Sequence, residues 1–256
     1  IAASARPAPA VPFPPVDPGP GTVDFDALAD VPHDDLLAVG ADLSPGTLLA
    51  AYRRGLFPMG VGEHGAPPIG WWRPERRGVL LPGDLRVSRS LRRSCRRYRV
   101  TVDRAFDAVV AACADPDRDG RWITDDVRLA YGVLHRLGWA HSIEVWTRPD
   151  RDADAGGEAR LVGGLYGVCI GGLFAGESMF HRAADASKVA LVALDALVLT
   201  PSRPQAVIDT QWSTEHLASL GVRELPRGAY AARLSEALAL PQPDLARADL
   251  PVGWPA

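Results

Sequence analysis

The stretch "ARLVGGLYGVCIGGLFAGESMF", Ala159 to Phe180, decides the fold. Two runs of apolar and small residues flank Gly171 and Gly172, a pattern that predicts two strands joined by a tight turn. A helix with one buried face follows in "DASKVALVALDALVL", Asp185 to Leu199, and a further strand in "QAVIDTQW", Gln205 to Trp212. Strands, helix and strand in this order predict an α+β domain on a mixed, largely antiparallel sheet.

The residues before and after this core supply the remaining predicted elements. Thr124 has the position of a helix N-cap, and Gly138 ends the same helix. The other predictions are a short arginine-studded helix running into a strand over 87–103, a helix over 103–116, a strand over 140–147 and a last helix over 213–221.

Composition divides the chain into three parts. Residues 1–22 contain many prolines and little to bury, which predicts an arm that is disordered or loosely draped over the protein. Residues 23–74 form a small N-terminal α/β domain, in which Ser44 caps a helix that begins at Pro45. The composition changes from acidic to basic near Pro74, so a second domain is predicted over 75–256.

Several classes of protein are disfavoured. The longest apolar run, Val189 to Leu199, is interrupted by Asp195 and is shorter than the roughly 20 residues of a membrane-spanning helix. Three widely spaced cysteines suggest neither disulfides nor a zinc cluster, so a reducing cytoplasm is expected. Metal and nucleotide motifs are not recognised, and no cofactor is predicted. "HSIE", with His141 and Ser142, lacks the other parts of a nucleophilic triad.

Arginine is concentrated in one segment. Residues 71–100 hold ten arginines against two acidic residues, whereas residues 1–50 hold seven aspartates and one arginine. This asymmetry favours a surface for a polyanion, although a charged run can also be an ordinary solvated helix face. Trp71, Trp72 and Trp122 could stack on bases. The arginines of the run are Arg86, Arg89, Arg92, Arg93, Arg96, Arg97 and Arg99.

Two charged residues interrupt the apolar core segments. Glu177 needs a positive or donating partner if it is buried, and a salt bridge to Lys188 or Arg182 is the simplest one. Lys188 is the only lysine among 28 basic residues. Either a compact ammonium is required near the start of the helix, or this single lysine has no special role and is present by chance in a chain that otherwise uses arginine.

Asp209 and Gln211 lie two residues apart at the end of a strand, so both side chains are expected on one face. A carboxylate beside an amide accepts a hydrogen bond from its NH₂ group, which would turn the amide oxygen of Gln211 toward a cleft. The alternative is a pair that satisfies nearby backbone groups.

Taken together, the motifs resemble those of the bacterial leucyl/phenylalanyl-tRNA–protein transferases, from about Phe13 to Tyr230, in the family's order and spacing. The resemblance rests on "LLAVGADLSP", "LLAAYRRGLFP", "PIGWW", "RVSRSLRR", "WIT", "AHSIEVW", "LVGGLYGV", "LFAGESMF", "DASKVAL", "VIDTQ", "HLASLG" and "ELPR". It implies transfer of leucine or phenylalanine from aminoacyl-tRNA to proteins with N-terminal arginine or lysine, which marks them for degradation by the N-degron route. It also implies a second domain similar to the GNAT acyltransferases and a cytoplasmic monomer with no membrane partner.

The resemblance also implies roles for individual residues. Asp209 and Gln211 match the family's catalytic pair, with Gln211 holding the attacking amine. The apolar side-chain pocket matches Leu165, Phe174 and Met179, and because Phe174 and Met179 are five apart, a β-bulge is expected near Gly176. Glu177 would meet either the amine of the aminoacyl ester or the basic side chain of the acceptor. The aromatic positions around the tRNA 3′ end match Tyr52, Trp122 and Tyr131.

The expected tRNA-binding residues are Met59, Arg89, Arg92, Arg93, Arg96 and Arg97. Met59 departs from the family, which has a tryptophan there to stack on the terminal adenine, and Trp71 or Trp72 could take its place. Gly70 and a longer loop over 151–158 are further departures. Two other functions stay open: a GNAT-type N-acetyltransferase that uses acyl-CoA, and a noncatalytic RNA-binding protein.

Overall fold

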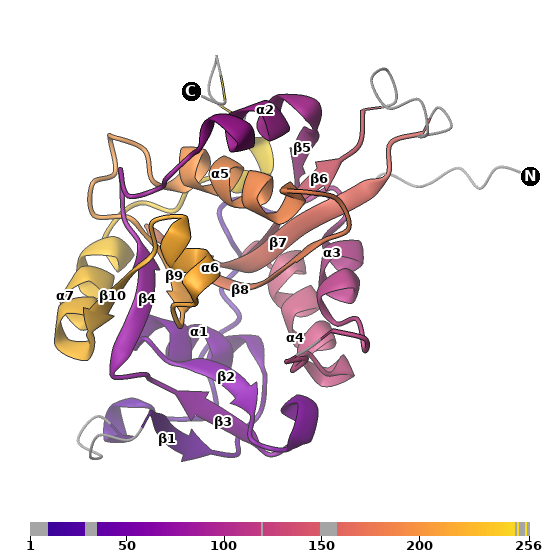
Figure 1. Ribbon diagram of the computed structural model, residues 1–256. Coiled ribbons are helices and arrows are strands. Elements are labelled where there is room, and N and C mark those ends of the chain that lie inside the picture. The colour runs from indigo at the N-terminus through magenta and orange to yellow at the C-terminus, as the bar shows by residue number, and fades with distance from the viewer. Residues whose placement is uncertain are drawn as a thin grey trace, which may run out of the picture.

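Two β-sheets organise the chain. The computed structural model describes residues 10–28, 35–118, 120–148, 158–248, 250 and 254. A three-stranded sheet has the order β1–β3–β2, and a seven-stranded sheet has the order β10–β4–β9–β8–β7–β6–β5 (Figure 1). The chain passes from the first sheet to the second between Trp72 and Arg76. This crossing lies at the change in composition near Pro74.

The N-terminal unit is built on helix α1. It contains the short helix η1 (Asp26–Leu28), β1 (Leu36–Val39), α1 (Pro45–Arg53), β2 (Phe57–Gly60), the short helix η2 (Glu63–Gly65) and β3 (Ile69–Trp72). As predicted, the Ser44 side chain accepts a hydrogen bond from the Thr47 backbone N–H at the start of α1. Leu48, Leu49 and Tyr52 are fully buried, so one face of α1 belongs to the apolar core of the protein.

The second unit is a mixed sheet with helices on both faces. Its elements are β4 (Arg76–Leu80), α2 (Arg89–Arg97), β5 (Arg99–Val102), α3 (Phe106–Cys113), α4 (Asp125–Arg136), β6 (Ala140–Trp146), β7 (Leu161–Ile170), β8 (Leu173–His181), α5 (Ala186–Val198), β9 (Val207–Gln211), α6 (Glu215–Ser219), β10 (Arg223–Pro226), α7 (Arg227–Leu238) and η4 (Leu245–Arg247). All strand pairs are antiparallel except β8 with β9. The predicted α+β class and largely antiparallel sheet are confirmed.

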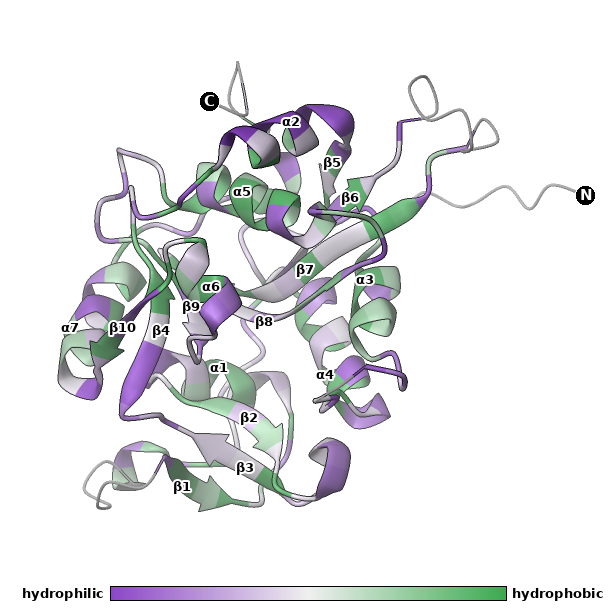
Figure 2. Cartoon of the chain, viewed as in Figure 1, coloured by the Kyte–Doolittle hydropathy of each residue, from purple (hydrophilic) through white to green (hydrophobic). Residues whose placement is uncertain are grey.

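The two faces of the large sheet bury different clusters. One cluster joins α5 and α2 to Leu165, Phe174 and Ile208. The other joins α1, α3 and α4 to Tyr166 and Ala175. Figure 2 shows α2 as largely hydrophilic on the outside of the molecule, with the more apolar α5 between it and the sheet. The arginine helix is therefore an outer layer over one face.

Strands β4 and β10 and helix α7 were not predicted from the sequence. Strand β4 pairs with β9 and β10, and α7 follows β10 directly. No helix was predicted beyond residue 221. The sequence of α7 gives only a weak signal, because it is rich in alanine and polar residues and has a weak apolar stripe. Its buried positions are Tyr230, Leu234 and Ala237. Both β4 and α7 deliver residues to the site described below.

Residues 10–22 lie against the rest of the chain, so this part of the arm is draped over the protein and not disordered. The Val16 N–H donates to the Leu137 carbonyl over 2.8 Å, and the Trp139 indole N–H donates to the Val16 carbonyl over 2.8 Å. A Cβ atom at Gly21 would lie 2.5 Å from the Thr47 backbone, so this segment also contacts α1. Residues 1–9 and the loop over 151–157 lie outside the described residues.

Glu144 on β6 is a buried carboxylate that organises the turn between β5 and α3. It accepts hydrogen bonds from the Ser142 and Thr101 hydroxyls, each over 2.5 Å, and from the Arg104 and Ala105 backbone N–H groups, each over 3.2 Å. Burial raises the pKa of Glu144 to about 7, a rise that these hydrogen bonds partly oppose. In the part of the chain that is described, no helix is both long and apolar enough to cross a membrane.

The raised pKa of Glu144 predicts a stability that falls as pH rises. The unfolded carboxyl titrates near 4.5 and the folded one near 7, so its contribution is complete below 4.5 and is lost as pH passes 7. At about 1.4 kcal/mol per pKa unit, the loss is at most about 3–4 kcal/mol. In urea unfolding between pH 4.5 and 8.5, a Glu144→Gln variant should lack this fall, so the difference between the two free energies of unfolding should change with pH. A constant difference across the range would contradict the prediction.

Candidate active site

Strands β8 and β9 pair at their beginning and then separate. Their parallel pairing covers Leu173, Phe174 and Ala175 of β8. Beyond this point a cavity of about 200 Å³ lies between the two strands. Its lining residues are Arg118, Leu165, Gly176, Glu177, Ser178, Met179, Leu191, Leu194, Ile208, Thr210, Gln211 and Leu217. The cavity is therefore apolar on the side of α5 and α6, and its polar side chains are Arg118, Glu177, Ser178, Thr210 and Gln211.

A β-bulge shapes this cavity and confirms the one predicted near Gly176. Tyr166 of β7 is opposite Ser178, and the next residue, Gly167, is opposite Gly176, so Glu177 is the extra residue of β8. Because one residue is added, Phe174 and Met179 lie on the same face despite their spacing of five. Met179 lines the cavity, opposite Leu165. Phe174 is fully buried in the apolar cluster against which Met179 packs, and it is not among the residues that line the cavity.

Glu177 is bound by tyrosines, so the expected salt bridge to Lys188 or Arg182 is wrong. The Tyr52 hydroxyl of α1 donates to Oε1 over 2.7 Å, and the Tyr131 hydroxyl of α4 donates to Oε2 over 2.9 Å. The two hydroxyl oxygens also lie in short contact with each other. Because each hydroxyl has a single proton, a hydrogen bond between them replaces one of the two to Glu177 unless the carboxyl itself carries a proton. Glu177 is 6% exposed, and burial raises its pKa to about 7 although both tyrosines lower it. Part of the Glu177 population is therefore neutral near pH 7.

Lys188 and Arg182 have other partners. The Lys188 ammonium donates to Oδ1 of Asp185 over 3.0 Å, within the first turn of α5. The Arg182 guanidinium lies over the Phe180 ring at 5.4 Å. Neither residue lines the cavity. The bulge turns the Glu177 side chain toward α1 and α4, away from both cations.

Asp209 is buried and paired with a cation that the sequence pattern does not reveal. Arg77 of β4 donates from Nε to Oδ1 over 2.8 Å and from Nη2 to Oδ2 over 2.7 Å. The Tyr230 hydroxyl of α7 donates to Oδ2 over 2.6 Å. In the sequence, Arg77 belongs to a charged run and Tyr230 to a segment without a predicted element. Neither position carries a signal for its contact.

The Gln211 side chain does not bind Asp209, so the predicted orientation of its amide by Asp209 is wrong. Asp209 Oδ1 accepts the backbone N–H of Gln211 over 2.8 Å, and the Gln211 amide Nε2 donates to Glu177 Oε1 over 3.3 Å. Gln211 has a φ of 59°, a left-handed conformation that ends β9. The carboxylate that orients the amide is therefore Glu177, while Asp209 orients the backbone.

Aromatic side chains of the N-terminal unit pack against Trp212, the residue that follows β9. Trp212 is 37% exposed and packs edge-on against Phe57 and Trp72 at centroid distances of 4.9 and 6.3 Å. The Met59 carbonyl accepts the Trp72 indole N–H, so Met59 and Trp72 are neighbours. Trp71 is 1% exposed, which removes it as a candidate for stacking on a base.

Trp122 precedes α4, and its backbone lies against η2. A Cβ atom at Gly65 would lie 2.2 Å from the Trp122 carbonyl oxygen. Trp122 thus belongs to the contact between the N-terminal unit and α4, and it is half-buried there.

Arg118 was not predicted as a site residue, and it lines the cavity between β8 and β9. Its guanidinium donates to the Cys113 and Met179 carbonyls over 3.0 and 2.9 Å.

The arginines of α2 are exposed but do not line the cavity. Leu91 and Cys95 point inward from this helix. Exposed positions include Arg89, Arg92, Arg93, Arg96 and Arg97. The helix therefore presents a basic face separated from the cavity by α5.

His141 and Ser142 are not paired with each other. The His141 imidazole Nδ1 lies 2.7 Å from the Asp103 carboxylate, whereas the Ser142 hydroxyl donates to Glu144. Both residues are buried. The geometry agrees with the rejection of a nucleophilic pair.

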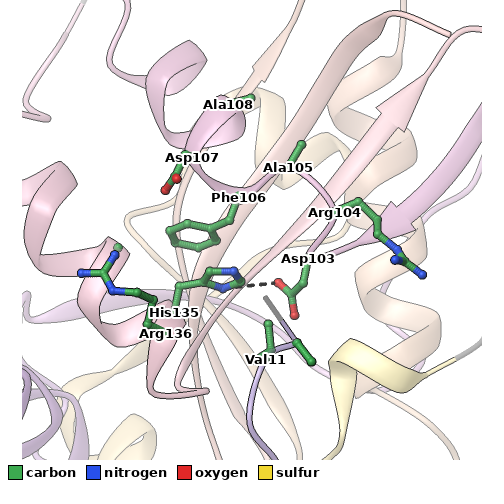
Figure 3. Close-up of a pocket in the computed structure, with 11 residues that line it drawn as sticks. Val11, Asp103, Arg104, Ala105, Phe106, Asp107, Ala108, His135 and Arg136 are labelled. Carbon is green, nitrogen blue, oxygen red and sulfur yellow. Dashed lines mark ion pairs between the residues drawn. The ribbon is translucent and has the colours of Figure 1, made fainter. Parts of the chain in front are cut away.

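A larger cavity, of about 570 Å³, lies elsewhere, beside α3 and α4 (Figure 3). His135 stacks on Phe106 at a centroid distance of 4.1 Å, and its imidazole lies 3.7 Å from the Asp103 carboxylate. Burial lowers the pKa of His135. None of the residues predicted for catalysis or binding lines this cavity.

Family models account for most of the chain. The model described as "Leucyl/phenylalanyl-tRNA protein transferase" matches residues 79–235, and the model of that family's N-terminal domain matches residues 41–75. The chain belongs to this family. It is an aminoacyltransferase, as the resemblance implied, and the cavity between β8 and β9 lies in the part that the larger model matches.

Curated relatives named leucyl/phenylalanyl-tRNA–protein transferase extend the match. The protein of Aromatoleum aromaticum is 48% identical over 87% of this chain and 85% of its own length. That of Anaeromyxobacter sp. strain Fw109-5 is 50% identical over 86% of this chain and 91% of its own. Among solved structures, the crystal structure of FemX has a TM-score of 0.45 at 11% identity, over 71% of this chain and 66% of that one. That likeness is too weak to bear on function.

The partner of Lys188 decides between the two interpretations of this residue. An i,i+3 ion pair at a partly exposed position contributes little to stability, and arginine can also form it. Lys188→Arg should therefore keep the free energy of unfolding within about 0.5 kcal/mol of the parent and the rate of aminoacyl transfer within about twofold. A tenfold loss of rate in a correctly folded Lys188→Arg variant would show that a compact ammonium is required.

Proposed function

We propose that the cavity between β8 and β9 holds the leucine or phenylalanine side chain of an aminoacyl-tRNA, and that the amino acid is transferred to the N-terminus of an acceptor protein. The observation that carries the proposal is a small apolar cavity with an amide and a carboxylate at its polar side. Leu165 and Met179 contact the side chain, and Phe174 supports them from below. A cavity shaped for side chains unbranched at Cβ disfavours valine and isoleucine.

The reaction exchanges one acyl bond for another. The α-amine nitrogen of the acceptor attacks the ester carbonyl carbon, a C–N bond forms, and the C–O bond to the terminal ribose breaks. The amine loses a proton and the departing ribose oxygen gains one, so no oxidant or cofactor is needed. Holding the amine and ester in contact can supply about 7–11 kcal/mol of the barrier reduction. Gln211 guides the amine by hydrogen bonding. It does not act as the base, because an amide oxygen is too weak a base to keep the proton that the amine loses.

Glu177 is assigned to the aminoacyl substrate. The α-amino group is attached to the carbon next to the side chain's Cβ, so a side chain held in the cavity brings its amino group to the same lining. Glu177 lines that cavity, and its ionised form attracts an ammonium. Tyr52 and Tyr131 hold both carboxylate oxygens, which fixes the direction from which the ammonium approaches.

The wider proposal follows the family. Acceptors begin with arginine or lysine, transfer marks them for N-degron proteolysis, and the enzyme works as a cytoplasmic monomer. Residues 23–74 and 75–256 act as two domains, the second GNAT-like, which the parting of the parallel strands β8 and β9 supports. An acyl-CoA enzyme is disfavoured, because its pyrophosphate loop opens a helix and residues 160–165 here run into β7. Trp72 beside Met59, Trp212 beside Trp72, and the half-buried Trp122 offer rings for the tRNA 3′ end.

The reaction is tested by transfer of labelled leucine from Leu-tRNA to two peptides that differ only at their N-terminus, arginine against alanine. Label should enter the arginine peptide alone. Transfer to both peptides would remove the acceptor specificity. Acetyl transfer from acetyl-CoA would favour the acyl-CoA alternative, and tRNA binding without any transfer would favour the noncatalytic one.

The basic face of α2 predicts a salt-dependent contribution to tRNA binding. Each phosphate that the protein neutralises contributes about 0.9 to the slope of log K against log salt. An Arg92→Ala/Arg93→Ala variant should weaken binding and make that slope shallower by about 1–2. Arg233→Ala on α7, which removes a charge elsewhere, is the matched control and should leave the slope unchanged. An unchanged slope in the double variant would mean that this face does not bind tRNA.

A further inference from the structure

Arg77 is a buried cation built into the site. It is 1% exposed, and its guanidinium lies between the rings of Phe57 and Tyr230, with centroid distances of 4.6 and 4.8 Å. Taking a guanidinium out of water is unfavourable unless it is paired with good geometry. Here the pairing is the two-pronged contact with Asp209. Four elements, β2, β4, β9 and α7, meet at this one charge.

The Asp209 carboxylate has no capacity left for a substrate. Its Oδ1 accepts from Arg77 Nε and the Gln211 backbone N–H, and its Oδ2 accepts from Arg77 Nη2 and the Tyr230 hydroxyl. A carboxylate offers about four acceptor positions, and all four are in use. Asp209 is also 1% exposed. It therefore neither takes the proton of an attacking amine nor contacts the Gln211 side chain.

We propose that Arg77 and Tyr230 are positioning residues for aminoacyl transfer. They fix the Asp209 carboxylate, Asp209 fixes the Gln211 backbone N–H, and the Gln211 side chain thereby reaches Glu177 at the cavity. The inference rests on the proposed function, since Gln211 must act on the attacking amine for its position to matter.

The conformation of Gln211 explains why such support is needed. The left-handed region is unfavourable for residues other than glycine, because Cβ comes too close to the following carbonyl oxygen. Gln211, at a φ of 59°, adopts this conformation where its N–H meets Asp209. If the carboxylate were free to rotate, this hydrogen bond would be absent in part of the population. The amide would then leave its place beside Glu177.

Lysine cannot replace Arg77 in this role. An ammonium is a compact charge that lacks the flat fork needed to bind both carboxylate oxygens in one plane. It also lacks the planar faces that pack against Phe57 and Tyr230. Arg77→Lys therefore keeps the positive charge but removes the two-pronged contact with Asp209 and the packing against the two rings.

The test measures single-turnover transfer from Leu-tRNA with enzyme in excess, together with KM for tRNA and peptide. Arg77→Lys should lower the transfer rate constant at least 30-fold, and Tyr230→Phe, which keeps the ring, about 3–10-fold. KM should change less than threefold, because neither residue contacts a substrate. Arg76→Lys is the matched control, an exposed neighbour paired with Glu224, and should stay within twofold.

A double-mutant cycle separates positioning from a structural role. The Arg77→Lys/Asp209→Asn double variant should have a transfer rate constant within about threefold of that of the Asp209→Asn single variant, because both substitutions act through Gln211. If folded Arg77→Lys enzyme transfers at the parent rate, the inference is wrong. Should that variant fail to fold, an unchanged rate in Tyr230→Phe overturns it equally. A parent protein that transfers no leucine would instead refute the proposed function.

Discussion

The single extra residue at Glu177 is the constraint on which the site depends. By interrupting the alternation of β8, it leaves Phe174 and Met179 on the α5 face while the Glu177 side chain turns to α1 and α4. The same interruption lies just past the last parallel pair of β8 with β9, where the strands separate and a cavity opens. A regular strand would place Phe174 and Met179 on opposite faces and would continue the sheet across the cavity.

Two buried carboxylates, Glu177 in the lining of the cavity and Asp209 behind it on β9, have opposite electrostatic environments. Asp209 is matched by a full cation and four donated hydrogen bonds. Glu177 has uncharged donors, two tyrosine hydroxyls and the Gln211 amide, and burial raises its pKa to about 7. The carboxylate that already has a countercharge suits a supporting role. In our proposal, the one without a countercharge attracts the ammonium of the substrate.

The N-terminal unit is part of this site. Tyr52 from α1 binds Glu177, and Phe57 from β2 packs on Arg77. Residues 10–22 connect α1 to the start of β6 through Val16 and Trp139. Any shift of this unit against the large sheet would therefore change both carboxylates together.

Local patterns in the chain were enough to predict the main elements of the large sheet and the arginine helix, whereas the roles expected of Glu177, Asp209 and Gln211 came from the resemblance to the family. The bulge near Gly176 was expected by combining the spacing of Phe174 and Met179 with the shared pocket that the resemblance implies. The partners of these residues could not be predicted in the same way. Tyr52 is 125 residues from Glu177, and Arg77 is 132 residues from Asp209. These pairs exist only in the folded protein, because β4 pairs with β9 within the large sheet and α1 packs against that sheet, which brings Tyr52 to Glu177 of β8.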